Sequence, residues 1–153
     1  MKTIKQIFDS AFATKEKRKW EKIFVAVDIH ETILEPTWSA ERSHTYYPFA
    51  KECLQMLTLM DDVCLIQWSS SSFENNLHYN QEFSKDDIEF DHINENPEVP
   101  STDYADFKKK FYINVIMDDK AGFDPLVDWI ELHQYLIELA EERDDERLLS
   151  LNE

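Results

Sequence analysis

The chain has 153 residues, of which 42% are hydrophobic and 13% aromatic, so its composition is globular and its length suits one domain with a single core. Gly122 is its one glycine, and this excludes the glycine-rich phosphate-binding loops of P-loop and dinucleotide-binding proteins. The net charge of −16 argues against a general nucleic-acid binder, because such a protein needs a basic surface.

The N-terminal segment, residues 1–21, differs from the acidic remainder. The helical spacing of Ile4, Ile7 and Phe8 predicts an amphipathic helix over residues 3–19. Residues 1–22 hold seven basic and three acidic side chains. A basic helix on an acidic body can contact a membrane surface or an acidic partner. A solvated helix face explains the same pattern, and we favour that explanation.

The compartment expected from the sequence is the cytoplasm. Cys53 and Cys64 lie in apolar runs, without the spacing of a metal motif or of a disulfide framework. Residues 1–22 lack the continuous apolar stretch of a signal peptide, and no segment has the length and apolarity of a membrane span.

Apolar runs predict four strands, which cover residues 23–28, 63–68, 88–93 and 111–117. Between them we expect a helix that begins near Pro48 and a second helix over residues 73–84. A last helix is expected from 125 to about 148, with Asp124 as N-cap and with Leu126, Trp129, Ile130, Leu136, Ile137 and Ala140 facing inward. Residues 33–47 and 94–103 have loop compositions.

Strands that alternate with helices predict an α/β domain with a mainly parallel sheet and helices on both faces. Right-handed crossovers place the carboxyl ends of all strands at one edge of such a sheet, where ligands bind. Asp28, Ser69 and Asp118 each follow a predicted strand. We therefore expect these three residues to meet at that edge, within a single domain spanning residues 1–153.

The order of these residues resembles the haloacid dehalogenase-like (HAD) hydrolase superfamily. Asp28-x-x-x-Thr32 follows the first strand, Ser69 the second, and Asp118-Asp119 the last, with lysines before it. The resemblance covers about residues 22–123, and it implies a three-layer Rossmann-like fold. The stretch 110–123 looks like a small group of such proteins, common in phage and bacterial genomes, that lack a sizeable cap domain.

The resemblance implies roles for the acidic and hydroxyl residues. Asp28 matches the nucleophile that forms an aspartyl-phosphate, and it also matches a Mg²⁺ ligand. Thr32 matches the threonine of the same motif and is expected at the substrate with Ser69. Ser69 matches the hydroxyl that binds the phosphoryl group, and Ser70 is the neighbouring alternative.

The resemblance also implies a lysine and a second set of magnesium ligands. Lys110, directly before the last strand, matches the lysine that offsets negative charge, with Lys108 and Lys109 as rivals. Asp118 matches a Mg²⁺ ligand, and Asp119 beside it is expected to act through water. The cofactor implied is therefore Mg²⁺.

The first motif departs from the family pattern at two positions. His30 stands where the family has its second aspartate, and Glu31 stands where it usually has glycine. The metal ligand at position 30 in the family is a backbone carbonyl, which His30 still provides. A histidine can also protonate a leaving alkoxide and later activate water. His30 is therefore a candidate acid/base, but the same change is compatible with slow or lost turnover.

No segment is long enough for a large cap, so the site is expected to be open. An open site suits a macromolecular substrate, or a smaller one shielded by homo-oligomerisation. Aromatic and polar residues of the first connection can line it and contact a nucleotide, although an exposed loop explains them equally well; they are Trp38, Arg42, His44, Tyr46 and Tyr47.

The main functional hypothesis is a Mg²⁺-dependent phosphatase that acts on a phosphorylated substrate. The alternative, from another class, is a catalytically weak or inactive HAD scaffold that serves as an interaction protein, and His30 and Glu31 favour it. A third hypothesis is a nucleic-acid end-processing phosphatase, and the acidity of the chain counts against it.

Overall fold

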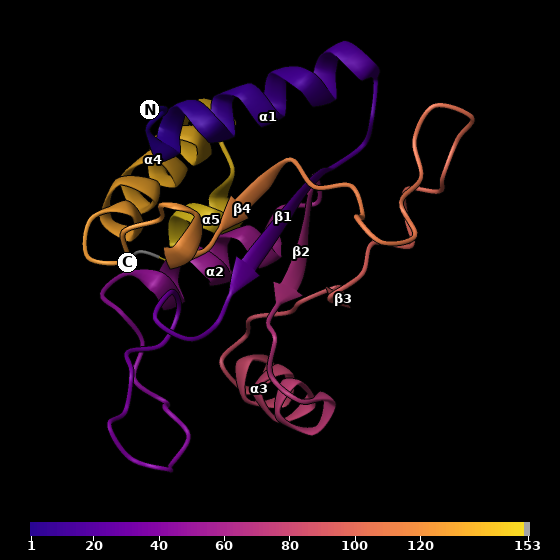
Figure 1. Cartoon of the computed structure of the whole chain (residues 1–153). Coiled ribbons are helices and arrows are strands. Elements are labelled where there is room, and N and C mark those ends of the chain that lie inside the picture. The colour runs from indigo at the N-terminus through magenta and orange to yellow at the C-terminus, as the bar shows by residue number, and fades with distance from the viewer. Residues whose placement is uncertain (152–153) are drawn as a thin grey trace.

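The computed structural model describes residues 1–151. Its strands are β1 (Ile23–Asp28), β2 (Val63–Trp68), β3 (His92–Ile93) and β4 (Val115–Met117). Its helices are α1 (Ile4–Arg18), α2 (Ala50–Leu59), α3 (Phe73–Lys85), α4 (Asp128–Glu142) and α5 (Glu146–Ser150), with a 3₁₀ turn, η1 (Asp119–Ala121). The strands form a parallel sheet in the order β3-β2-β1-β4 (Figure 1). The predicted α/β class, the parallel sheet and the lack of a large cap are confirmed.

The register of the central strands positions the residues that follow them. Asp28 pairs with Trp68 across β1 and β2, so Ser69 begins the loop just beyond the end of β1. Val27 pairs with Met117 across β1 and β4, so Asp28 and Asp118 occupy equivalent places on neighbouring strands. Helix α3 and the loop before α2 extend beyond these strand ends (Figure 1).

The main core lies on the face of the sheet that carries Val25, Val27 and Leu65. Side chains of all five helices join this core, including Phe8 of α1 and Trp129 of α4, both fully buried. The burial of an aromatic side chain of this size stabilises a fold by roughly 3 kcal/mol. The predicted inward positions Trp129, Leu136 and Ala140 are buried, and Ile137 packs against them in part.

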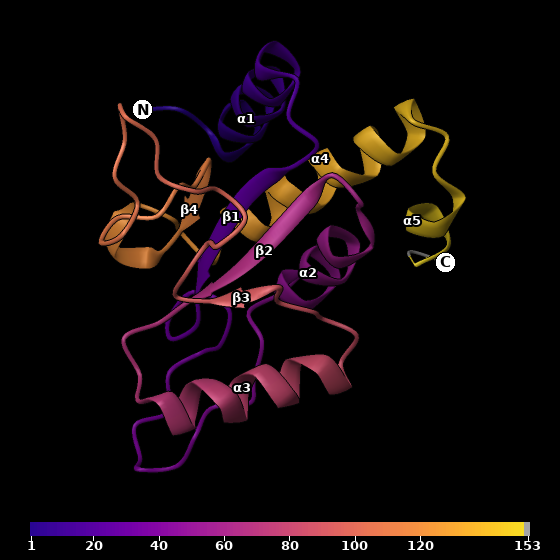
Figure 2. The same cartoon turned by 90° about the vertical axis from the view of Figure 1, so that its right-hand side faces the viewer.

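The opposite face of the sheet carries a smaller hydrophobic cluster, which is covered by irregular segments and not by helices. Phe24, Ala26, Cys64 and Ile66 pack there against side chains from irregular segments, which are Trp20, Trp68, Val99, Phe111, Tyr112 and Ile113. Residues 94–114 cross this face, with α4 behind the strands (Figure 2). A helical layer was expected here, but this segment contains Pro97 and Pro100 and has no apolar stripe of helical period.

Both outer strands are shorter than predicted, for the same physical reason. Strand β3 begins at His92 rather than 88, and β4 begins at Val115 rather than 111. Before β4, the amide oxygen of Asn114 accepts from the backbone N–H of Phe24. Before β3, a carboxylate oxygen of Asp91 accepts from the backbone N–H of Leu65. A side chain thus replaces a backbone carbonyl in each ladder, and regular pairing begins only after it.

The predicted C-terminal helix is divided and starts later than expected. Asp124 does accept from Leu126 N–H, but it begins a turn over residues 124–127, in which Val127 N–H donates to the Asp124 carbonyl, and α4 begins at Asp128. Leu126 lies in that turn and is 63% exposed, and Ile130 is 48% exposed, so their predicted burial is wrong. After α4, Asp144 adopts a left-handed backbone conformation, and Asp145 caps the separate helix α5.

Helix α2 also starts later than predicted. Phe49 has a left-handed backbone conformation with φ of 67°, so the helix begins at Ala50, two residues after Pro48. The last two residues of the predicted C-terminal segment, 152–153, lie outside the described residues. None of the helices in the described part of the chain combines the length and the apolar character that a membrane crossing requires.

Candidate active site

Three half-buried carboxylates converge at the carboxyl edge of the sheet. Asp28 ends β1, while Asp118 and Asp119 follow β4, and one oxygen from each lies within 4.8 Å of the others. The Asp118 side chain accepts from Lys120 N–H over 2.9 Å, and its backbone carbonyl accepts from Ala121 and Phe123. The short turn η1 therefore fixes the carboxylates after β4 in place.

Thr32 lies beneath this cluster and is fully buried. Its hydroxyl lies 3.1 Å from Asp28 Oδ2 and 3.3 Å from Asp119 Oδ1, and it accepts from Asp119 N–H over 3.0 Å. The backbone carbonyl of Thr32 accepts from Trp129 Nε1 over 2.7 Å. Because a hydroxyl has a single hydrogen, it donates to one carboxylate at a time. Thr32 thus positions the aspartates, and its burial argues against the predicted contact with substrate.

The electrostatics of the cluster are unfavourable without a cation. Burial, and then the charge of Asp118, raise the pKa of Asp28 to about 7, although the Thr32 hydroxyl acts in the opposite direction. Such crowding of carboxylates is typical of functional sites, because structural aspartates usually pair with cations. Nearby oxygen ligands of this kind suit a hard divalent ion.

A cavity of about 440 Å³ opens beside the three carboxylates. Besides the aspartates, it is lined by His30, Glu31, Trp68, Ser69, Ser70, Asn94 and Lys120. Ser69 is buried, and its hydroxyl oxygen accepts from Ser71 N–H over 3.2 Å, which uses a lone pair and not the hydrogen. Ser70 is exposed at the same cavity. Both predicted serines are therefore next to the acidic cluster.

Asn94 supports the Ser69 loop from β3. Its amide oxygen accepts from Ser69 N–H over 2.9 Å, and its amide nitrogen donates to Ser69 O over 2.7 Å. No local sequence pattern marks Asn94 or Trp68 as a site residue, because their role depends on which strands become neighbours. Each directly follows or ends a strand, which is the one signal that could have identified them.

His30 lines the cavity, but its imidazole ring also contacts residues outside the cavity lining. Its Nε2 lies 3.2 Å from Ser71 Oγ, and its ring packs edge-on against Tyr79 of α3, with 5.3 Å between centroids. Glu31 follows with φ of 60°, the left-handed region that favours glycine. A glutamate therefore adopts here a backbone conformation that glycine adopts without strain.

The structure separates the predicted lysine from the site. Lys108, Lys109 and Lys110 are all exposed on the segment before β4, and none is among the residues that line the cavity. Lys120 lines it instead, directly after Asp118 and Asp119. Its position directly after Asp118-Asp119 is the sequence feature that marks it, whereas the motif order of the resemblance indicates a lysine before the strand.

The aromatic and polar residues of the first connection also lie outside the cavity lining. Trp38 is 94% exposed, and the Arg42 guanidinium donates to Asn75 Oδ1 over 2.8 Å and 3.1 Å. His44 packs against His78, and the Tyr46 hydroxyl donates to Asp86 over 2.8 Å. These contacts fasten the loop to α3, so the predicted substrate-lining role of this loop is not supported.

No family model and no curated protein matches the chain. Among solved structures, the chain is similar to a conserved protein from Bacteroides thetaiotaomicron, with 25% sequence identity and a TM-score of 0.58. The similarity covers 76% of this chain and 91% of the other. It supports a Rossmann-like α/β fold over most of the chain, and it assigns no chemistry to the acidic cluster.

Proposed function

We propose that the protein is a Mg²⁺-dependent phosphatase of the HAD type, which hydrolyses a phosphate monoester through an aspartyl-phosphate on Asp28. One observation carries the proposal. Asp28, Asp118 and Asp119 come from the ends of two neighbouring parallel strands and bring their carboxylates within 4.8 Å, at a cavity that Ser69 also lines. Ligands bind at this edge in open α/β sheets.

The donor set of this cluster fits magnesium. Asp28 and Asp118, with the backbone carbonyl of His30, would hold the ion, and Asp119 would act through water. All of these ligands are oxygens, which Mg²⁺ prefers. The raised pKa of Asp28 supports the same fit, because a divalent cation compensates both the burial of this carboxylate and its repulsion from Asp118. When bound, Mg²⁺ supplies Lewis acidity and neutralises phosphoryl charge.

The chain's own residues would carry the two transfer steps. In the first, Asp28 forms a bond to phosphorus, and the bond from phosphorus to the leaving oxygen breaks. The Ser69 hydroxyl and the Lys120 ammonium bind the phosphoryl oxygens, while an acid protonates the leaving alkoxide. In the second step, water attacks phosphorus, releases inorganic phosphate and restores the Asp28 carboxylate.

His30 is the candidate for the proton transfers, because it lines the same cavity. Its Nε2 contact with Ser71 Oγ must be exchanged for the leaving oxygen before it can act. This contact is the observation that favours the second candidate function, a catalytically weak HAD scaffold that serves as an interaction protein. The open site suits a phosphorylated macromolecule or a nucleotide as substrate. A cytoplasmic location and homo-oligomerisation are expectations from the sequence.

The proposal is tested by hydrolysis of a generic aryl phosphate with Mg²⁺. We expect Asp28→Asn to lower the rate by at least about 10³-fold, as is usual for the loss of a nucleophile. Asp61→Asn is the matched control, because this carboxylate is 94% exposed and precedes β2, at the opposite end of that strand from Ser69. Equal and negligible rates for wild type and Asp28→Asn at several pH values would reject the phosphatase hypothesis and favour the scaffold hypothesis.

A further inference from the structure

A second cluster of metal-ligating side chains lies on the other face of the sheet. Cys64, His92 and Glu98 each bring one ligand atom within 4.8 Å of the other two. Register explains how the first two meet. His92 of β3 pairs with Ile66 of β2, and Cys64 lies two residues before Ile66, so all three side chains point to one face.

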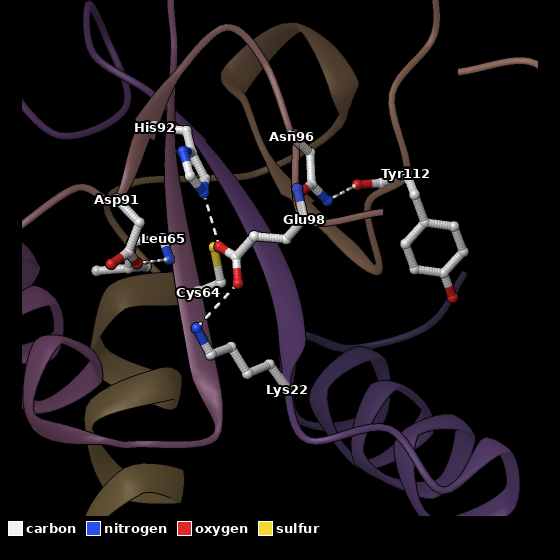
Figure 3. A network of polar contacts seen from close by, with 8 residues as sticks. All are labelled: Lys22, Cys64, Leu65, Asp91, His92, Asn96, Glu98 and Tyr112. Atoms are coloured by element: carbon white, nitrogen blue, oxygen red, sulfur yellow. Dashed lines mark hydrogen bonds and ion pairs between the residues drawn. The ribbon is translucent and has the colours of Figure 1, made fainter. Parts of the chain in front are cut away.

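Glu98 reaches this pair from the segment that crosses the face. Its Oε2 accepts from His92 Nε2 over 2.6 Å and from Cys64 Sγ over 3.2 Å, while Lys22 Nζ donates to Oε1 over 2.9 Å (Figure 3). One carboxylate oxygen therefore faces the thiol and the imidazole, and the other is held by an ammonium group. The three ligand atoms therefore lie close together, and an ion between them needs only a small opening of these two contacts.

The backbone around Glu98 is fixed by a buried asparagine. The Asn96 amide nitrogen donates to the backbone carbonyl of Tyr112 over 2.8 Å, and its amide oxygen accepts from Glu98 N–H over 3.2 Å (Figure 3). Asn96 is only 5% exposed. In known metal sites, hydrogen bonds from neighbouring residues orient the metal ligands. Asn96 orients the backbone of Glu98 in this way, and Lys22 orients its carboxylate.

We infer that Cys64, His92 and Glu98 form a Zn²⁺-type binding site, separate from the three aspartates and independent of the phosphatase proposal. Sulfur, imidazole nitrogen and one carboxylate oxygen are the ligand types that Zn²⁺ takes, commonly with a fourth ligand from water. The aspartate cluster offers oxygen alone and suits Mg²⁺. Glu98 and Lys22 also line an open cavity of about 460 Å³, so the site borders solvent on the Glu98 side.

Binding requires that the two hydrogens now directed at Glu98 leave the site. The Cys64 thiol gives its proton to the buffer, and the Nε2 hydrogen of His92 is lost or moves to Nδ1. Burial and then the Glu98 contact raise the pKa of Cys64 far above its usual range, so the metal-free site holds a thiol. Thiolate and carboxylate together balance the charge of a divalent ion, and Lys22 keeps its bond to Oε1.

The competing explanation is a hydrogen-bond network that only fastens residues 94–100 to β2 and β3. Both explanations use the same contacts, so loss of stability in variants cannot separate them. They differ in whether sulfur binds a metal. Cobalt distinguishes them, because Co²⁺ replaces Zn²⁺ in tetrahedral sites and a bound thiolate gives a near-ultraviolet charge-transfer band.

The experiment titrates reduced, metal-free, full-length protein with Co²⁺, and then adds Zn²⁺. We expect one equivalent of Co²⁺ to develop the sulfur band and visible bands, and one equivalent of Zn²⁺ to remove them. Cys64→Ser should lose the sulfur band. Cys53→Ser is the matched control, because Cys53 is the other buried thiol and its Sγ donates to Trp129 O in the main core. It should keep the band.

Two further variants keep the test decisive if Cys64→Ser fails to fold. His92→Ala, at a half-buried position of the short outer strand, should weaken Zn²⁺ binding by at least about tenfold in competition with a chromogenic chelator. Asp28→Asn should leave both the band and the affinity unchanged, whatever its effect on phosphatase activity. Absence of the sulfur band in wild type, or its loss in Asp28→Asn, would overturn the proposed site.

Discussion

The Thr32 hydroxyl and the Asp28 carboxylate lie 3.1 Å apart, four residues from each other in the chain and beneath the open cavity. The same hydroxyl accepts from the backbone N–H of Asp119, which follows the neighbouring strand β4. One buried oxygen thus links the two strands that supply the acidic cluster. The position of Asp28 relative to Asp119 is therefore held by this link together with the turn η1.

Replacement of Thr32 by valine, which has the same shape, should disturb the acidic cluster. Asp119 N–H loses its buried acceptor, and this should lower the free energy of unfolding by about 1–3 kcal/mol. Mg²⁺ affinity, measured by calorimetry, should fall by about tenfold, because Asp28 and Asp119 lose their shared partner. Thr58→Val is the control, since that hydroxyl donates to Leu54 O within α2 and is remote from the aspartates in the chain. Equal Mg²⁺ affinity in wild type and Thr32→Val would contradict the positioning role.

Replacement of Asp28 by asparagine should stabilise the metal-free protein at neutral pH. The pKa of Asp28 is raised to about 7 in the folded protein, above the usual aspartate value. The folded state therefore binds the proton more tightly, and wild type should lose stability as pH rises from about 4 through about 7. Because the group is half-exposed and screened, we expect a loss of about 1 kcal/mol, absent from Asp28→Asn.

Urea unfolding with a chelator at about pH 5 and about pH 8 measures this effect. Addition of Mg²⁺ at the higher pH should then stabilise wild type and leave Asp28→Asn nearly unchanged, because the variant lacks a ligand. Asp61→Asn should follow wild type in both conditions. A wild type that gains stability between the two pH values without metal, relative to Asp28→Asn, would contradict the electrostatic account.

The sequence was sufficient to predict the elements whose pattern is local. Strands β1 and β2 are continuous apolar runs, and their observed bounds agree with residues 23–28 and 63–68. Because each run ends in or before a polar residue, the meeting of Asp28, Asp118 and Ser69 at one edge followed from parallel topology alone. The structure brings these three residues to one cavity.

The features that the sequence did not reveal depend on contacts between distant segments. Strand β4 is short because Asn114 pairs with Phe24 through its side chain, and no local pattern marks that exchange. Lys110 matches the motif by its place before a strand, yet it is exposed and does not line the cavity. No local pattern predicts the cluster of Cys64, His92 and Glu98 either, because its three members come from β2, β3 and the loop after β3.

Glu31 offers a test of the backbone at the first motif. Its φ of 60° costs a residue with a side chain about 1 kcal/mol, and glycine avoids this cost. Glu31→Gly should therefore be more stable than Glu31→Ala by about 1 kcal/mol, the reverse of the order at an ordinary helix position. Urea unfolding of the two variants measures the difference. Greater stability of the alanine variant would show that the loop does not hold this conformation in solution.

Lys120 and Lys110 can be compared directly as candidates for the charge-neutralising lysine. Lys120 lines the cavity beside Asp118 and Asp119, whereas Lys110 is exposed on the segment before β4. Removal of a cation that binds the phosphoryl group should lower aryl phosphate hydrolysis by about 10²-fold, so we expect this loss for Lys120→Ala. Lys110→Ala should retain wild-type activity. A large loss in Lys110→Ala with little change in Lys120→Ala would restore the assignment made from motif order, and it would require the segment before β4 to move over the cavity when substrate binds.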